Sequence, residues 1–112
     1  MHVIPSIDVE KIADLQSQLE HLSPYYRRFQ IDYADGKFVN FTTPTIVELL
    51  SALLSHETLL FDIHLMTLDF HRALDLINKT LPKLNIGVVF VHHASKPSPA
   101  MFLDTNSPYQ LG

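Results

Sequence analysis

FQIDYADGKFVNF, at residues 29–41, alternates hydrophobic with polar side chains, and FDIHLM, at residues 61–66, repeats the alternation. Side chains two positions apart share one face of a β-strand, so each stretch predicts a strand with one apolar and one polar face. The polar faces carry Asp32 and His64. A strand that presents a carboxylate or an imidazole on one side needs a polar partner there, which makes these two stretches the candidate functional site.

The composition of the 112 residues is that of a folded domain. Hydrophobic residues make up 46% of the chain, enough to build a core and too many for a disordered segment. The net charge of -4 and the lack of a basic cluster argue against a nucleic-acid partner. Apolar runs stay far below the roughly 18 residues that a membrane span needs, so we expect no membrane partner.

Cysteine is absent from the chain, which excludes disulfides, zinc–thiolate sites and thiol catalysis. The first residues, MHVIPSID, lack the basic region and the long apolar run of a signal peptide. Both observations fit the reducing cytoplasm, and we expect a cytoplasmic location.

Hydrophobic spacing predicts four strands that alternate with three helices. The expected strands span residues 3–7, 28–33, 59–65 and 86–91. Between them apolar side chains recur at helical spacing, and the predicted helices begin after Asp8, after Thr43 and near Leu68. Such alternation is typical of βαβ units in a parallel sheet with right-handed crossovers, which makes the predicted fold class α/β.

Two helix starts and one strand carry more detailed expectations. Asp8 is predicted to cap the first helix, and Thr43 the second, with Pro44 at its first position. The last strand, residues 86–91, is almost wholly apolar, which predicts burial on both faces.

Polar side chains lie at or near the carboxyl ends of the predicted strands. Ser6, Asp32 and His64 do so on the first three strands, and the adjacent His92 and His93 on the fourth. The carboxyl ends of parallel strands are where (β/α)8 barrels and open α/β sheets place their sites. One interpretation makes the two adjacent histidines a metal-binding pair. More often adjacent side chains of a strand point to opposite faces, so that only one of the two enters a shared site.

Two structural alternatives compete with this interpretation. Asp35-Gly36 is also typical of a β-hairpin, which would make the fold α+β and leave Asp32 on the surface of an antiparallel ribbon. His64 alone is more often a hydrogen-bonded core residue than a metal ligand. Asp62, on the same face, would then be the buried partner that fixes the tautomer of this histidine.

At these residues the chain resembles the ribulose-phosphate 3-epimerase family, which includes allulose-6-phosphate 3-epimerases. Three motifs carry the resemblance in the family's order: PSI at residues 5–7, QIDYADGKFVNF at residues 30–41 and DIHLM at residues 62–66. The second motif agrees with the family signature at Asp32, Asp35, Gly36, Phe38 and Val39. The third agrees in full at Asp62, His64, Leu65 and Met66.

The family folds as a (β/α)8 TIM barrel, which takes roughly 200 residues or more. The resemblance therefore implies that residues 1–112 form one partial domain, the N-terminal half of a barrel. It would hold four parallel strands, three to four helices and the start of a fifth strand at residues 109–112. The chain is then either a truncated fragment, which we favour, or a natural half-barrel. Unpaired first and last strands lead us to expect a homo-oligomer.

The resemblance also implies an isomerase of carbohydrate metabolism, of the kind that serves the pentose phosphate pathway. Such an enzyme inverts the carbon next to the ketone of a sugar phosphate, with two carboxylates as acid and base and a divalent metal of the zinc or iron type. By resemblance, Asp32 is one acid/base and a metal ligand, and His64 is a second ligand. Ser6, His64 and Met66 would contact the substrate.

Three departures from the family pattern stand beside these matches. Gln30 replaces a histidine ligand, Ala34 replaces a methionine of the apolar lid, and Val91-His92-His93 replaces a His-x-Glu motif. No family role is carried onto the fourth strand. With one of two carboxylates present, the isolated chain is expected to be inactive. The alternative function is that of a degenerate relative that binds or assembles without catalysis, and metal content separates the two.

Overall fold

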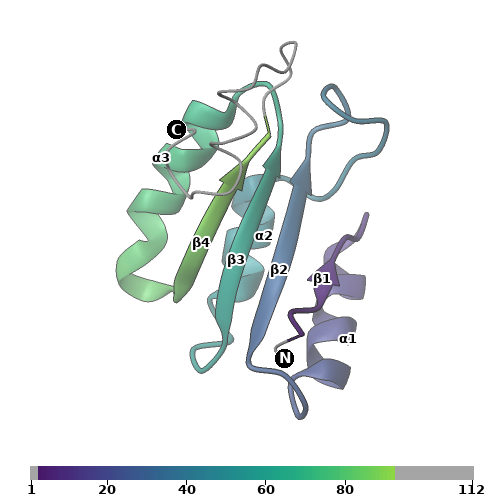
Figure 1. Ribbon diagram of the computed structural model, residues 1–112, viewed down its shortest axis with the longest axis vertical. Coiled ribbons are helices and arrows are strands. Elements are labelled where there is room, and N and C mark those ends of the chain that lie inside the picture. The colour runs from purple at the N-terminus through teal and green to yellow at the C-terminus, as the bar shows by residue number, and fades with distance from the viewer. Residues whose placement is uncertain (1–2, 93–112) are drawn as a thin grey trace.

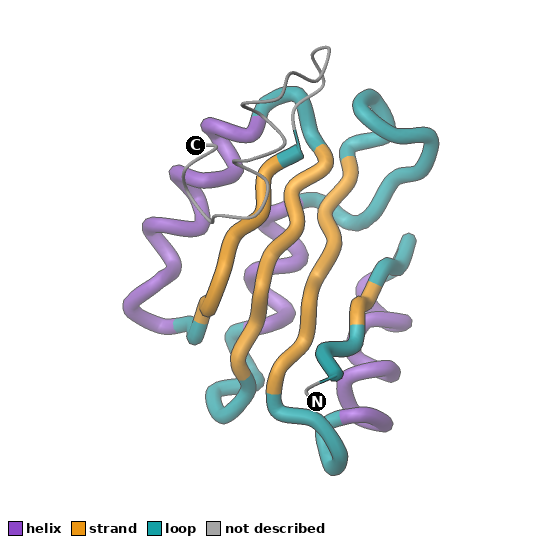
Figure 2. Tube along the Cα trace, in the orientation of Figure 1, coloured by secondary structure: helices purple, strands orange, loops and turns teal. Residues whose placement is uncertain are grey.

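One four-stranded sheet, with three helices on one of its faces, makes up the computed structural model, which describes residues 3–92 (Figure 1, Figure 2). The elements in chain order are β1 (Ser6–Ile7), α1 (Ile12–Leu22), β2 (Arg28–Ala34), α2 (Ile46–Leu53), β3 (Leu60–Met66), α3 (Phe70–Thr80), a 3-10 helix (Leu81–Lys83) and β4 (Ile86–Val91). No helix in this described part is long and apolar enough to cross a bilayer. The predicted fifth strand at residues 109–112 lies outside the described residues.

The strands lie in the order β1-β2-β3-β4, and every neighbouring pair is parallel. One helix connects each strand to the next, so the described chain consists of three consecutive βαβ units. This confirms the predicted α/β class, and the arrangement matches half of a (β/α)8 barrel. All three helices pack in one core with the same face of the strands, and within residues 3–92 no helix covers the other face (Figure 1).

The core fills the space between the sheet and its helices. Alternate strand residues point to the helices, and these are the hydrophobic ones, as the period of two predicts. The fully buried side chains of this cluster include Phe29, Ile31, Phe61, Ile63, Leu65 and Val89 from the strands and Leu15, Leu19, Leu49, Leu53 and Ile77 from the helices. The polar residues of the same strands are therefore left for the opposite face.

The hairpin alternative is wrong, because β2 pairs with β3 in parallel and residues 37–45, between Gly36 and α2, form no strand. Gly36 does turn the chain, with a positive φ of 79° that favours glycine. The turn closes a loop, joined by a single antiparallel bridge between Asp35 and Thr42. The motif thus links a strand to a helix.

Asp35 organises that loop and ties it to the next one. Its Oδ1 atom accepts hydrogen bonds from the backbone N–H groups of Lys37 (2.9 Å) and Phe38 (3.2 Å). Its Oδ2 atom accepts a hydrogen bond of 2.7 Å from the buried hydroxyl of Thr67, at the end of β3. Burial raises the pKa of Asp35, but the hydrogen bonds together outweigh burial, and the pKa falls below its usual value of 3.8.

The helix starts differ from the predicted ones. Asp8 caps no helix, because Lys11 holds the N-cap position of α1 and makes no side-chain cap. Thr45, rather than Thr43, caps α2 and forms a capping box with Glu48. The reciprocal pair of hydrogen bonds in a capping box satisfies two backbone donors at once, which a cap two residues earlier does not offer.

β4 is buried on one face only, so the predicted burial on both faces is wrong for the described residues. Val89 and Val91 are buried against the core, whereas Val88 and Phe90 on the other face are half-buried. The difference follows from the single layer of helices, which covers one side of the sheet.

An ion pair ties β2, β3 and β4 together toward their amino ends. Asp62 is 3% exposed and accepts hydrogen bonds from Arg28 Nε (2.8 Å), Arg28 Nη2 (2.9 Å) and the Val88 N–H (2.9 Å). The hydrogen bond with Asp62 raises the pKa of Arg28. Asp62 therefore binds Arg28 rather than His64, contrary to the alternative in which it fixes the histidine tautomer.

Gly87→Ala is expected to lower the free energy of unfolding by about 1–3 kcal/mol, as extra methyl groups do in packed sites. The added Cβ would lie 2.7 Å from Asp62 Oδ1 and 3.1 Å from Arg28 Nη2, two atoms held by the ion pair. Urea unfolding of both single variants and of Gly87→Ala with Asp62→Ala measures the interaction as a double-mutant cycle. The methyl group should cost much less once the carboxylate is gone. Equal costs in both backgrounds would contradict this account.

Asp35→Asn is expected to lower the free energy of unfolding at pH 7 by about 1 kcal/mol. An amide has a single acceptor oxygen, so it does not accept both the two backbone N–H hydrogen bonds and the one from the Thr67 hydroxyl. A folded pKa below 3.8 means that the carboxylate stabilises the fold above that pH and loses this effect as the pH falls further. The gap between wild type and variant should therefore shrink in acid, as measured by urea unfolding across the pH range. Asp75→Asn, at an exposed pair with Lys79, is the matched control and should change little. A gap that stays constant with pH speaks against the proposed cause.

Candidate active site

Polar side chains gather on the helix-free face, toward the carboxyl ends of the strands. Gln30 and Asp32 come from β2, His64 comes from β3, and His92 follows β4 directly. In the parallel register Asp32 is the direct partner of His64. Residues paired in this way lie on the same face of neighbouring strands, so the two alternating stretches of the sequence meet here.

Asp32 and His64 are in contact. Oδ1 of Asp32 lies 3.3 Å from Nδ1 of His64, and the two side chains are 13% and 19% exposed. The same Oδ1 atom accepts a hydrogen bond of 3.0 Å from the side-chain amide of Gln30. On the far side of the imidazole, Nε2 of His64 lies 2.7 Å from Nδ1 of His92. The four side chains thus form one continuous polar row across three strands.

His92 is held in place by its backbone and by two rings. Its N–H donates a hydrogen bond of 3.1 Å to the Leu65 carbonyl, which continues the pairing of β3 with β4 by one residue. Its ring centroid lies 4.8 Å from that of His64 and 5.9 Å from that of Phe38, in the loop after β2. In the sequence, only its position directly after a predicted strand indicated that His92 lies near the site. His93 lies outside the described residues.

Ser6 and Met66 share the face of Asp32. Ser6 is exposed on β1 and pairs with Gln30, two residues before Asp32. Met66 is 7% exposed at the end of β3 and pairs with Ala34, two residues after Asp32. The register therefore places the predicted substrate-contacting residues on either side of the Asp32–His64 pair along the strands.

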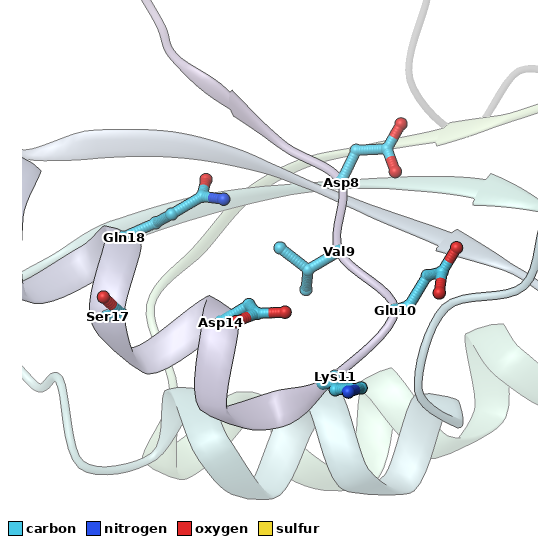
Figure 3. A pocket seen from close by; sticks show the side chains of 7 residues that line it. All are labelled: Asp8, Val9, Glu10, Lys11, Asp14, Ser17 and Gln18. Carbon is cyan, nitrogen blue, oxygen red and sulfur yellow. The ribbon is translucent and has the colours of Figure 1, made fainter.

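Asp8, which was predicted to cap the first helix, is a further carboxylate at this end of the sheet. Burial raises the pKa of Asp8, and the negative charge of Asp32 raises it further. Asp8 also borders an open depression of about 530 Å³, in which its carboxylate and that of Glu10 point away from α1 (Figure 3). The other lining residues are Val9, Lys11, Asp14, Ser17 and Gln18. The depression is lined by α1 and the loop before it, and none of its lining residues belongs to the polar row.

The donors available for a metal ion are few in the part of the chain that the structure describes. Within residues 3–92 no three histidine or carboxylate side chains are grouped so that they could hold one ion. Asp32 and His64 supply two donors whose separation of 3.3 Å equals the spacing of about 3.3 Å between two ligands of a tetrahedral ion with bonds of about 2.0–2.1 Å. The side-chain amide nitrogen of Gln30 donates its hydrogen bond to Asp32. The pair fits a metal ion as part of a ligand set.

A comparison with protein families agrees with the fold and the motifs. The model of the ribulose-phosphate 3 epimerase family matches residues 2–106, which include the whole described sheet and the polar row. No curated protein and no solved structure matches the chain. The family match covers most of the sequence and all three motifs that carried the resemblance. The chain belongs to the ribulose-phosphate 3-epimerase family.

Proposed function

We propose that the polar row, with Asp32 and His64 at its centre, is the proton-transfer site of a metal-dependent sugar-phosphate 3-epimerase. The contact of Asp32 with His64 at 3.3 Å, on the helix-free face of a parallel sheet, is the observation that supports it. Family membership supplies the reaction class, an isomerisation at the carbon next to the ketone of a ribulose phosphate. The cytoplasmic location stays a prediction.

Asp32 is assigned the role of acid/base. Gln30 and His64 both lie at Oδ1, so Oδ2 is the atom that we assign to the substrate. It takes the proton from C3, and the C–H electron pair forms the C2=C3 bond of an enediolate, with the charge on the former ketone oxygen. Returning the proton to the same face restores the substrate. Inversion needs a second acid on the opposite face.

Asp32 and His64 are the residues that would hold a divalent ion of the zinc or iron type. When bound, the ion supplies positive charge to the developing oxyanion. The His64 ring would border the bound sugar beside Asp32, and the Ser6 hydroxyl is available to donate a hydrogen bond to the substrate. Met66 offers an apolar surface against the planar intermediate. Their places along β1 and β3, on the face of Asp32, support these roles.

A second candidate is a family member that binds or assembles without catalysis. Gln30 favours it, because the amide holds Asp32 by a hydrogen bond where the family has a histidine ligand. Ala34 favours it as well, since the apolar lid loses a methionine there. The two candidates differ in whether Asp32 can remove a proton.

Exchange of the C3 proton of the sugar with solvent deuterium tests the proposed function, because this exchange needs only one carboxylate, that of Asp32. In D2O the zinc-loaded chain is expected to replace the C3 proton of ribulose 5-phosphate by deuterium without net epimerisation, because Asp32 serves one face only. Asp32→Asn should slow this exchange at least about 100-fold, the usual contribution of a general base. Proton NMR of the sugar measures both outcomes.

Asp75→Asn, at an exposed position of α3, is the matched control and should exchange like wild type. Equal exchange rates in wild type and Asp32→Asn would contradict the acid/base role of Asp32. No exchange by wild type would favour the non-catalytic candidate.

We further propose that a second copy of the chain pairs with the edges of the sheet. β1 and β4 are the edge strands among the described residues, and exposed edges pair readily with other strands. Two copies joined twice, β4 to β1, would give eight parallel strands related by a twofold axis, the number in the family's barrel. Sedimentation equilibrium is expected to give about twice the chain mass of 12.8 kDa. A monomer at micromolar concentration would contradict the proposal.

A further inference from the structure

We propose that His92 positions the His64 imidazole: its Nδ1 atom accepts the Nε2 proton of His64, which leaves Nδ1 of His64 to hold a divalent ion together with Asp32. This inference rests on the proposed metal-dependent function and adds a residue that directly follows β4. The family resemblance carries no role onto that strand, because the usual His-x-Glu motif is replaced there.

The two contacts of the His64 ring differ in length, and each length fits a different kind of interaction. Nδ1 lies 3.3 Å from Asp32 Oδ1, whereas Nε2 lies 2.7 Å from His92 Nδ1. A charge-assisted hydrogen bond between nitrogen and carboxylate oxygen spans about 2.7–2.9 Å, so the first contact is long for one. Two ligands of one tetrahedral ion lie about 3.3 Å apart, so the second contact is short for that. Asp32 and His64 are spaced as ligands, and His64 and His92 as a hydrogen-bonded pair.

The chemistry of imidazole then fixes which atom carries the proton. A neutral ring has one N–H and one lone pair, and a metal ion takes the lone pair. If Nδ1 of His64 binds the ion, the proton stays on Nε2 and needs an acceptor. Metal-binding histidines almost always donate this second N–H to a partner that sets the ring orientation. His92 Nδ1 is that partner in this chain.

The surroundings of His92 are suited to a positioning role. Its backbone is fixed by the hydrogen bond to the Leu65 carbonyl, and its ring packs near that of Phe38. Phe38 belongs to the loop that Asp35 organises through two backbone hydrogen bonds. The acceptor atom is thereby held by β3 on one side and by the loop after β2 on the other.

Zinc affinity of four proteins tests the inference, measured by competition with a chromophoric chelator. His92→Leu keeps the shape of the side chain near the ring but removes the acceptor, and should weaken zinc binding about 10–100-fold, the usual effect of losing such a partner. His92→Asn places an amide oxygen where Nδ1 was and should bind close to wild type. His71→Leu, at an exposed histidine of α3, is the matched control and should not change affinity. Circular dichroism checks that all four are folded.

Nitrogen-15 NMR of the zinc-loaded wild type gives a second readout, because it identifies the protonated ring atom. The Nε2–H tautomer of His64 is expected, and the Nδ1–H tautomer would overturn the inference. Wild-type affinity in His92→Leu, or equal weakening in His92→Asn and His92→Leu, would overturn it while leaving the proposed metal site intact. A wild type that binds no zinc would overturn both this inference and the metal dependence of the proposed function. The exchange assay on Asp32 would still judge the acid/base role separately.

Discussion

The parallel register of β2 against β3 is the constraint on which the site depends. It pairs Asp32 with His64, and the same pairing points Phe29 and Ile31 into the core. Side chains alternate between faces with a period of two, so a slip of one residue would bury the carboxylate and expose the two hydrophobic residues. The free energy of core burial therefore also holds the two polar groups in contact.

The two ends of the polar face differ in function: the amino ends of the strands hold a structural ion pair, and the carboxyl ends hold the candidate active site. Toward the amino ends, Asp62 is saturated by Arg28 and the Val88 N–H, an arrangement that ties three strands and leaves no oxygen to react. Toward the carboxyl ends, Asp32 has fewer and longer contacts, at 3.0 Å from Gln30 and 3.3 Å from His64, which suits a group that must bind or transfer something. This division matches the general rule for barrels, in which stability lies at one end and chemistry at the other.

The fold was largely predictable, and its errors are local. Periods of two and 3.6 residues report which face is buried, and this gave all four strands and three helices in the described chain. The N-caps were predicted at the wrong residues because several residues near a helix start can act as an N-cap. In α2, Thr45 is the N-cap because it forms reciprocal hydrogen bonds with Glu48. Burial of β4 was missed because an apolar sequence does not say how many layers cover it.

For the site, the sequence alone determined which residue types stand at the carboxyl ends of the strands, including Asp32 and His64, and it determined the family through three motifs. Only the tertiary structure decided their partners. Asp62 binds Arg28, and His64 contacts His92. These contacts depend on distances between neighbouring strands and loops, and the spacing of residues along the sequence does not give those distances. Alternation fixes the face on which a side chain lies, whereas the contact it makes depends on the register and reach of the adjacent strand.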